Sequence, residues 1–209
     1  RYEYLPDRVA DAIEKYVDVE RLLGLMASDV DPVIEEESFT ESSLHGRKCI
    51  AVADDEAFNF TYRENIRRLE SRGRVVRFSP LRDNRLPDDC DFLYLPGGYP
   101  EFYLPALSAN ASMKRSVRDY IESGGYALAE CGGMMYLCDT IRGMDGRDYP
   151  MCGVLSEAAT MEGMRLHLGY RRMVYKGKEL RGHEFHYSST IGSTPSVAQQ
   201  YNVRGEAVE

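Results

Sequence analysis

The sequence predicts an α/β protein with an open, mainly parallel sheet, helices on both faces and antiparallel additions at one edge. Four compact apolar runs have the length of buried strands and lie at 49–53, 75–78, 92–95 and 126–129. Segments with helical spacing of apolar residues separate them, chiefly 58–72 and 112–123. Strands that alternate with helices are typical of a parallel sheet whose two faces are both covered. Between 153 and 188, polar and apolar residues alternate at period two, as in antiparallel strands.

The chain opens with two short amphipathic segments. Apolar residues recur at helical spacing over 7–17, just after Pro6, and again over 19–26 after Asp18, which suits a helix N-cap. Between 29 and 46, acidic residues are interleaved with serine and threonine, which is too polar a composition to bury much surface. The predicted organisation is a helical appendage at 1–28, an acidic linker at 29–46 and a main domain at 47–209.

The main domain begins with a strand and a helix. The strand is predicted at 49–53, and the helix at 58–72 places Tyr62, Ile66 and Leu69 on one face before Gly73 ends it. A second helix at 112–123 is followed by Gly124 and Gly125, and a third short helix is compatible with 134–137.

Composition limits the class of protein. The chain has 209 residues, enough for one sizeable domain and an appendage. Its 34 acidic and 26 basic residues give a net charge of −8, the wrong sign for neutralising a nucleic-acid backbone. No apolar stretch is long enough for a membrane span, and no secretory signal is visible. The five cysteines form no C-x-x-C pair, which argues against a disulfide framework or a zinc site and favours the cytoplasm.

Two glycine-marked turns follow strands of the predicted sheet, at the edge where ligands bind in such folds. The first contains Gly97 and Gly98, and the second contains Cys131 between a strand and Gly132. A cysteine at a sharp strand-to-helix turn has the geometry of a nucleophile elbow. The start of the helix favours the thiolate, and the Gly132 amide points to where an oxyanion would form.

Cys131 is therefore the candidate nucleophile, with Gly97, Gly98, Tyr99 and Gly132 as candidate oxyanion or substrate-binding residues. The alternative interpretation is that Cys131 is one more inert buried thiol, as many lone cysteines are. The four other cysteines have no such context and are assigned to the core or the surface.

Four motifs together give a family resemblance. They are GGYPE at 97–101, ECGGMMYL at 130–137, LGYR at 168–171 and GHEFHYS at 182–188. In this order the motifs resemble cobyrinate a,c-diamide synthases, in the part of those enzymes that is a class I glutamine amidotransferase domain. The resemblance covers about residues 49–188.

The resemblance implies a carbon–nitrogen ligase with glutamine as the amide-nitrogen donor. Cys131 matches the family nucleophile, which attacks the glutamine carboxamide, releases ammonia and leaves a thioester that water hydrolyses. Gly98 and Gly132 match the oxyanion region. The ammonia would amidate the a and c carboxylates of a cobyrinate-type tetrapyrrole in cobalamin biosynthesis. The implied partners are glutamine, the tetrapyrrole acceptor and a synthetase domain. The helical appendage resembles the end of that synthetase domain.

Two expected features are missing from the sequence. The first is a phosphate-binding loop: Gly177 and Lys178 are followed by Glu179 and not by the serine or threonine of such a loop. ATP and Mg are therefore expected only in the synthetase domain, and no cofactor or metal is expected in this chain. The other is the family's general-base histidine, which the resemblance places downstream of Glu209. We therefore expect a domain truncated at its C-terminal end and slow or inactive alone.

His183 and His186 are the remaining candidates for the base. Their separation of three residues puts them on opposite faces of a strand, so at most one should point at Cys131. Otherwise the motif is structural or lines the acceptor site. The sequence leaves other roles open: Glu130 either orients an elbow amide or caps the helix, and the latter is the safer assumption. Arginines at 165, 171, 172 and 181 either meet acceptor carboxylates or form a solvated face.

Three alternative functions remain open. The acceptor could be a related tetrapyrrole, such as hydrogenobyrinate or nickel-sirohydrochlorin. The chain could be a non-catalytic docking module that lacks its base. It could also be another acyl-transferring cysteine enzyme on the same fold.

Overall fold

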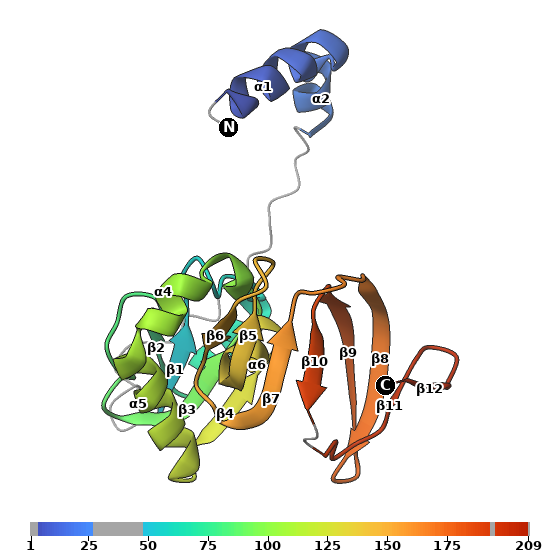
Figure 1. The fold of residues 1–209 in the computed structure, drawn as a ribbon. Coiled ribbons are helices and arrows are strands. Elements are labelled where there is room, and N and C mark those ends of the chain that lie inside the picture. Colours follow the sequence, from blue (N-terminus) through green and yellow to red (C-terminus); the bar gives the residue numbers. More distant parts are fainter. Residues whose placement is uncertain (1–3, 27–47, 193–194, 209) are drawn as a thin grey trace. The chain divides into compact units, whose positions relative to one another are not determined.

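The computed structural model describes residues 4–26, 48–192 and 195–208 (Figure 1). The chain divides into two compact units, Arg1–Phe39 and Thr40–Glu209. The predicted acidic linker at 29–46 lies outside the described residues.

The first unit contains the two predicted helices, α1 (Leu5–Tyr16) and α2 (Val19–Met26). Pro6 lies in the first turn of α1, where its missing N–H costs no hydrogen bond. The Asp18 carboxylate accepts the Arg21 N–H at 3.0 Å, so the predicted N-cap of α2 is confirmed. The described residues of both helices lack a buried side chain. The helical appendage is therefore confirmed as secondary structure, without a core of its own.

The second unit contains a four-stranded, fully parallel sheet in the order β2-β1-β3-β4. The strands are β1 (Cys49–Ala53), β2 (Arg74–Phe78), β3 (Cys90–Leu95) and β4 (Tyr126–Ala129). Every predicted apolar run is a strand, with its start at most two residues from the prediction. Because side chains alternate along β1, Ile50 and Val52 join one apolar cluster, whereas Ala51 and Ala53 join the other.

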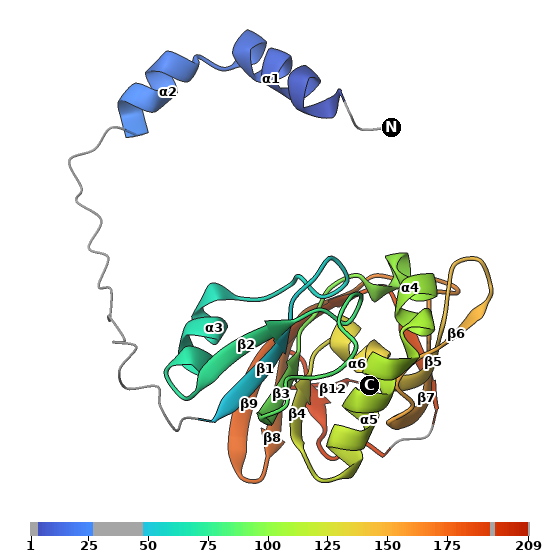
Figure 2. The ribbon, with the colours of Figure 1, turned by 90° about the vertical axis from the view of Figure 1, so that its left-hand side faces the viewer.

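Helices cover both faces of this sheet, as Figure 2 shows. The helices are α3 (Arg63–Glu70), α4 (Leu104–Ala109), α5 (Ala111–Glu122) and α6 (Gly132–Leu137). Through Ile66, α3 packs on the Ile50 face, and the other three helices pack on the opposite face through residues such as Leu107 and Val117. Asn110 accepts the Met113 N–H at 3.3 Å and so caps α5.

The helix predicted at 58–72 starts later, at Arg63. Residues before it form an ordered loop rather than a helical turn, because the Phe60 N–H bonds to the Gly97 carbonyl and the Phe58 N–H bonds to Asp55. This loop brings the end of β1 to the first glycine turn.

Two further four-stranded sheets hold the remaining strands, in the orders β10-β7-β5-β6 and β12-β11-β8-β9. Their bounds are β5 (Cys138–Arg142), β6 (Asp148–Pro150), β7 (Leu155–Thr160), β8 (His167–Tyr175), β9 (Lys178–His186), β10 (Ser189–Gly192), β11 (Gln200–Tyr201) and β12 (Ala207–Val208). All their pairings are antiparallel except that of β5 with β7. The α/β class is confirmed. The antiparallel strands were predicted as additions at one edge of the parallel sheet, but they form sheets of their own, because they pair with one another and not with β1–β4.

Gly177 and Lys178, which match only part of a phosphate-binding loop motif, lie at the tip of the β8–β9 hairpin. Tyr175 pairs with Lys178, and both residues between them, Lys176 and Gly177, have positive φ. This is a two-residue hairpin turn and not a loop that opens a helix, so these residues do not fit the phosphates of ATP. None of the helices in the described ranges is long and apolar enough to span a membrane.

Candidate active site

Cys131 lies at a strained turn between β4 and α6. Its φ and ψ of 49° and −111° place it in the left-handed half of the backbone map, which non-glycine residues rarely occupy. Among the described non-glycine residues, positive φ is otherwise found only at Lys176. Cys131 is an exposed residue, whereas Cys49, Cys138 and Cys152 are buried and Cys90 is half-buried. The structure thus gives Cys131 the elbow geometry that the sequence predicts.

The two glycine turns meet directly behind the elbow. A Cβ atom on Gly132 would lie 2.8 Å from the Pro100 ring and 3.2 Å from the backbone nitrogen of Gly98. A Cβ atom on Gly133 would overlap the Leu95 carbonyl at the end of β3. Glycine is therefore required at both positions, because the start of α6 lies against the end of the neighbouring strand.

Gly98 is also packed against the loop after β1. A Cβ atom there would overlap the Ala57 carbonyl oxygen and lie 2.8 Å from the Cα atom of Phe58. The Tyr99 N–H donates to that Ala57 carbonyl at 3.0 Å, and the Phe60 N–H donates to Gly97 at 3.1 Å. Backbone bonds thus hold the first glycine turn in place.

Asp55, which the sequence analysis did not select, anchors this loop. Its buried carboxylate accepts the N–H groups of Ala57 and Leu81, both at 2.9 Å, and the Ser79 hydroxyl at 2.8 Å. The signal present in the sequence was an acidic residue just beyond a buried strand. A carboxylate that accepts several donors joins the ends of β1 and β2 where the site is built.

The amides of Gly98 and Gly132 are suited to act as oxyanion donors. Within the described residues, the Gly98 N–H has no protein acceptor, and the Gly132 N–H is directed at the Cys131 sulfur. Because both amides adjoin the elbow, an oxygen bound between them would lie next to the thiol.

The thiol itself is not acidified, contrary to the expectation from the helix start. Desolvation raises the pKa of Cys131 above its usual range, the Gly132 N–H partly opposes this, and the charges of Glu101 and Glu130 raise the pKa further. The six-residue α6 provides only a small dipole, and desolvation of the thiol outweighs it. The thiol therefore needs a base to react at neutral pH.

Glu130 does not cap α6, contrary to the safer assumption from the sequence. Its carboxylate accepts the hydroxyl of Tyr94 on β3, and no side chain caps the first turn of α6. The Glu130 backbone is held as well, since its N–H donates to Leu95 and its carbonyl accepts the Gly133 N–H, both at 2.9 Å. Burial and Glu130 together raise the pKa of Tyr94, so its phenol stays protonated as a donor. These bonds hold Glu130, the residue before the nucleophile, in place.

Neither candidate base contacts the thiol. His183 lies opposite Tyr170 on β9 and contacts the Tyr62 hydroxyl through Nε2 at 3.3 Å. His186 stacks on His167 with ring centroids 4.8 Å apart, and its Nδ1 lies 2.9 Å from the Ser188 carbonyl oxygen. In the part of the chain that the structure describes, neither forms a hydrogen bond with Cys131, and their roles stay predictions.

Aromatic side chains flank the elbow. A Cβ atom on Gly97 would lie 3.6 Å from the Phe60 side chain and 3.7 Å from the Cβ atom of Cys131, so Phe60 packs close to the elbow. The Phe60 ring is in turn 5.6 Å from that of Tyr62. Tyr99 is exposed and its ring lies 6.1 Å from Phe102. The predicted substrate-binding role of Tyr99 is compatible with this position.

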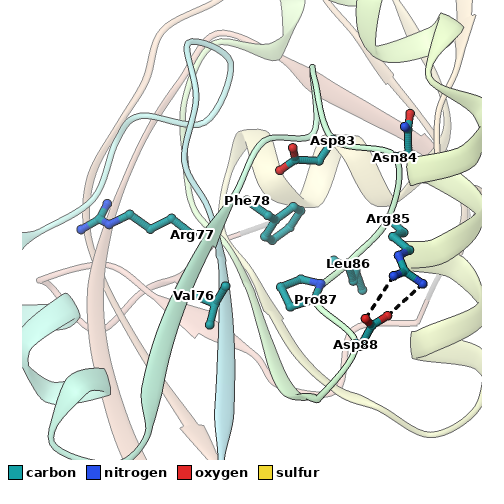
Figure 3. A pocket seen from close by; sticks show the side chains of 9 residues that line it. All are labelled: Val76, Arg77, Phe78, Asp83, Asn84, Arg85, Leu86, Pro87 and Asp88. Carbon is teal, nitrogen blue, oxygen red and sulfur yellow. Dashed lines mark hydrogen bonds and ion pairs between the residues drawn. The ribbon is translucent and has the colours of Figure 1, made fainter. Parts of the chain in front are cut away.

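A cavity of 430 Å³ lies elsewhere, between β2 and the loop that follows it (Figure 3). Its charged side chains are engaged with the protein: Arg85 pairs with Asp88, and Asp83 accepts the Ser79 N–H. None of its lining residues was predicted to take part in the chemistry. Over the described ranges, no cluster of three metal-ligating side chains occurs.

The fold and the elbow define a class of α/β protein with a cysteine presented above a parallel sheet. The chain belongs to the family of CobB/CobQ-like glutamine amidotransferase domains, whose sequence model matches residues 49–208. It is 42% identical over 202 residues to a cobyrinate a,c-diamide synthase of Syntrophotalea carbinolica, which covers 92% of this chain and 44% of the relative. The enzyme of the same name from Methanothermobacter thermautotrophicus is 40% identical over 206 residues, 94% of this chain and 45% of the relative. The chain thus spans less than half the length of these relatives.

A solved structure supports the fold. PurLQS from Thermotoga maritima superposes with a TM-score of 0.51, over 76% of this chain and 84% of that one, at 16% sequence identity. At this identity the likeness concerns the fold alone.

Proposed function

We propose that this chain is the glutaminase part of a cobyrinate a,c-diamide synthase, which supplies ammonia for ATP-dependent amidation of a tetrapyrrole in the cytoplasm. The observation that carries the proposal is Cys131, an exposed residue on a strained turn, next to the backbone amides of Gly98 and Gly132. The names of the full-length relatives support the acceptor and the reaction.

The proposed chemistry follows from these groups. The Cys131 sulfur attacks the carbonyl carbon of the glutamine carboxamide, and the negative charge that develops on the oxygen is held by the Gly98 and Gly132 amides. The thiol proton passes to the leaving nitrogen through a base, and ammonia departs as the C–N bond breaks. Water then hydrolyses the thioester to glutamate and the free thiol. ATP and Mg would act in the synthetase domain, which is outside this chain.

The test uses the full-length protein that contains this chain. We expect Cys131→Ala to abolish glutamine-supported amidation while amidation supported by added ammonia persists, because the synthetase chemistry does not use the thiol. A glutamine-analogue electrophile should label Cys131, as located by peptide mass spectrometry. Labelling of the buried Cys138 instead, or glutamine turnover in Cys131→Ala, would contradict the proposal.

The docking-module alternative has two observations in its favour. Among the described residues, no histidine is hydrogen-bonded to Cys131, and the pKa of the thiol is raised. Ammonia release from glutamine by the full-length protein separates the two functions, since a docking module releases none. Assays with cobyrinate, hydrogenobyrinate and nickel-sirohydrochlorin identify the acceptor.

A further inference from the structure

The β8–β9 hairpin has one solvent-exposed face, and its side chains change from apolar to cationic along the strands. In an antiparallel pair, directly opposed residues project to the same side. Opposed pairs along this face are Leu168 with Phe185, Tyr170 with His183, and Arg172 with Arg181. Leu168, Tyr170 and Phe185 are 63%, 73% and 50% exposed. The face therefore changes from apolar through aromatic to cationic within three cross-strand pairs.

The cationic end is unusual for a chain with a net charge of −8. Two arginines directly opposite each other repel and weaken strand pairing. Here Glu179 contacts both, at 3.2 Å from Arg172 and 2.7 Å from Arg181. Each guanidinium has five N–H donors, so most of them are left for a ligand after one contact with Glu179.

A cavity of 600 Å³ lies at this end, between β8–β9 and the β11–β12 turn. Four arginines line it, Arg171, Arg172, Arg181 and Arg204, and no acidic side chain is among its described lining residues. Arg171 projects from the opposite face of β8, where its guanidinium pairs with Glu184, so Arg172, Arg181 and Arg204 are the arginines available to a ligand on this face. Arg172 packs over the Tyr201 ring, which holds its guanidinium at the cavity.

We infer that this face binds the tetrapyrrole acceptor, with its ring on the Leu168, Tyr170 and Phe185 end and its peripheral carboxylates on the arginines. A ligand that is both a large apolar ring and a polycarboxylate matches the graded face, because guanidinium groups bind carboxylates in bidentate fashion. The inference rests on the proposed function and gives the hairpin the role of one wall of the acceptor site. Through the contact of His183 with Tyr62, this wall adjoins the aromatic residues beside the elbow.

The test measures KM for cobyrinate in the full-length protein. We expect the double variant Arg172→Gln and Arg181→Gln to raise this KM about tenfold to a hundredfold. KM for glutamine should not change, because neither arginine touches the elbow. Arg204→Gln, in an exposed turn, tests the same cavity without disturbing strand pairing. Added salt should weaken cobyrinate binding more in the unchanged protein than in the double variant.

Arg142→Gln is the matched control. Arg142 is also a strand arginine that pairs with acidic side chains, Asp148 and Glu162, and its side chain is 40% exposed, against 46% for Arg172. The inference is overturned if the double variant and Arg204→Gln bind cobyrinate like Arg142→Gln, or if all of them weaken binding equally. It is also overturned if the variants impair subunit or domain assembly while the KM for cobyrinate stays the same. The proposed function fails separately, by glutamine turnover in Cys131→Ala.

Discussion

The elbow and the β8–β9 hairpin are built on different physical principles. At the elbow, neighbouring segments are so close that Gly98, Gly132 and Gly133 have no room for a Cβ atom. The crowding atoms are the carbonyl oxygens of Ala57 and Leu95 and the ring of Pro100. On the hairpin, the outward side chains are exposed, and His183 contacts Tyr62 at the start of α3. The comparison teaches that reaction geometry is set by the backbone, whereas the surface suited to recognition is set by side chains. Substitutions at the elbow should therefore change the reaction rate, whereas substitutions on the hairpin should change binding.

Gly98→Ala should have the largest effect on activity. The added methyl group overlaps the Ala57 carbonyl, so the turn must move and carry the Gly98 amide away from the oxyanion position. We expect glutamine hydrolysis to fall about a hundredfold to a thousandfold. The measurement is glutamate release by the full-length protein.

Gly24→Ala is the control for this substitution, because a Cβ atom on Gly24 meets nothing within 4 Å. Its glutaminase rate should equal that of the unchanged protein. If Gly98→Ala hydrolyses glutamine at the unchanged rate, the oxyanion role of Gly98 is wrong.

Asp55→Ala should have the largest effect on stability. The substitution leaves the N–H groups of Ala57 and Leu81 and the Ser79 hydroxyl without their acceptor in a buried place. We expect the free energy of unfolding to fall by about 3 kcal/mol, measured by urea denaturation. Asp54→Ala is the control, since its ion pair with Arg77 is partly exposed, and it should cost less than about 1 kcal/mol. Equal losses for both variants would show that Asp55 does not anchor the loop.

The parallel sheet could be predicted because burial on both faces leaves a plain signal in the sequence. The runs at 49–53 and 126–129 coincide with β1 and β4, and the glycine pair after Cys131 is needed where α6 meets β3. The start of α3 was not predicted correctly. The apolar residues Phe58 and Phe60 fit a helix by spacing, but they belong to a loop that bonds to Asp55 and Gly97.

Electrostatics was the least predictable part of the site. The helix start at Cys131 indicated an acidic thiol, whereas desolvation and, to a smaller extent, the charges of Glu101 and Glu130 raise its pKa. Glu101 belongs to a separate glycine turn, and only the folded chain brings it to the thiol. The hydrogen bond from Tyr94 to Glu130 likewise joins residues far apart in the sequence, and no local sequence pattern predicts it.

Glu101→Gln tests this electrostatic account with a moderate effect. The carboxylate disfavours the thiolate, so its removal should lower the pKa of Cys131 and shift the pH profile of alkylation toward lower pH. Alkylation by iodoacetamide at pH 7 to 8 should therefore be faster in the variant. Glu64→Gln, which removes a remote and exposed carboxylate paired with Arg68, should leave the profile unchanged. A shift toward higher pH in Glu101→Gln would be the opposite of the expected sign.

Tyr62→Phe should have the smallest effect and tests how the hairpin is attached. The substitution removes the 3.3 Å contact between the Tyr62 hydroxyl and His183, two exposed side chains, and keeps the ring against Phe60. Because water replaces such an exposed bond, we expect a loss of about 0.5 kcal/mol in urea denaturation and no change in glutamine hydrolysis. A fall in glutamine hydrolysis without a change in stability would instead connect His183 to the reaction through Tyr62. That result would show that the hairpin takes part in the reaction and not only in recognition.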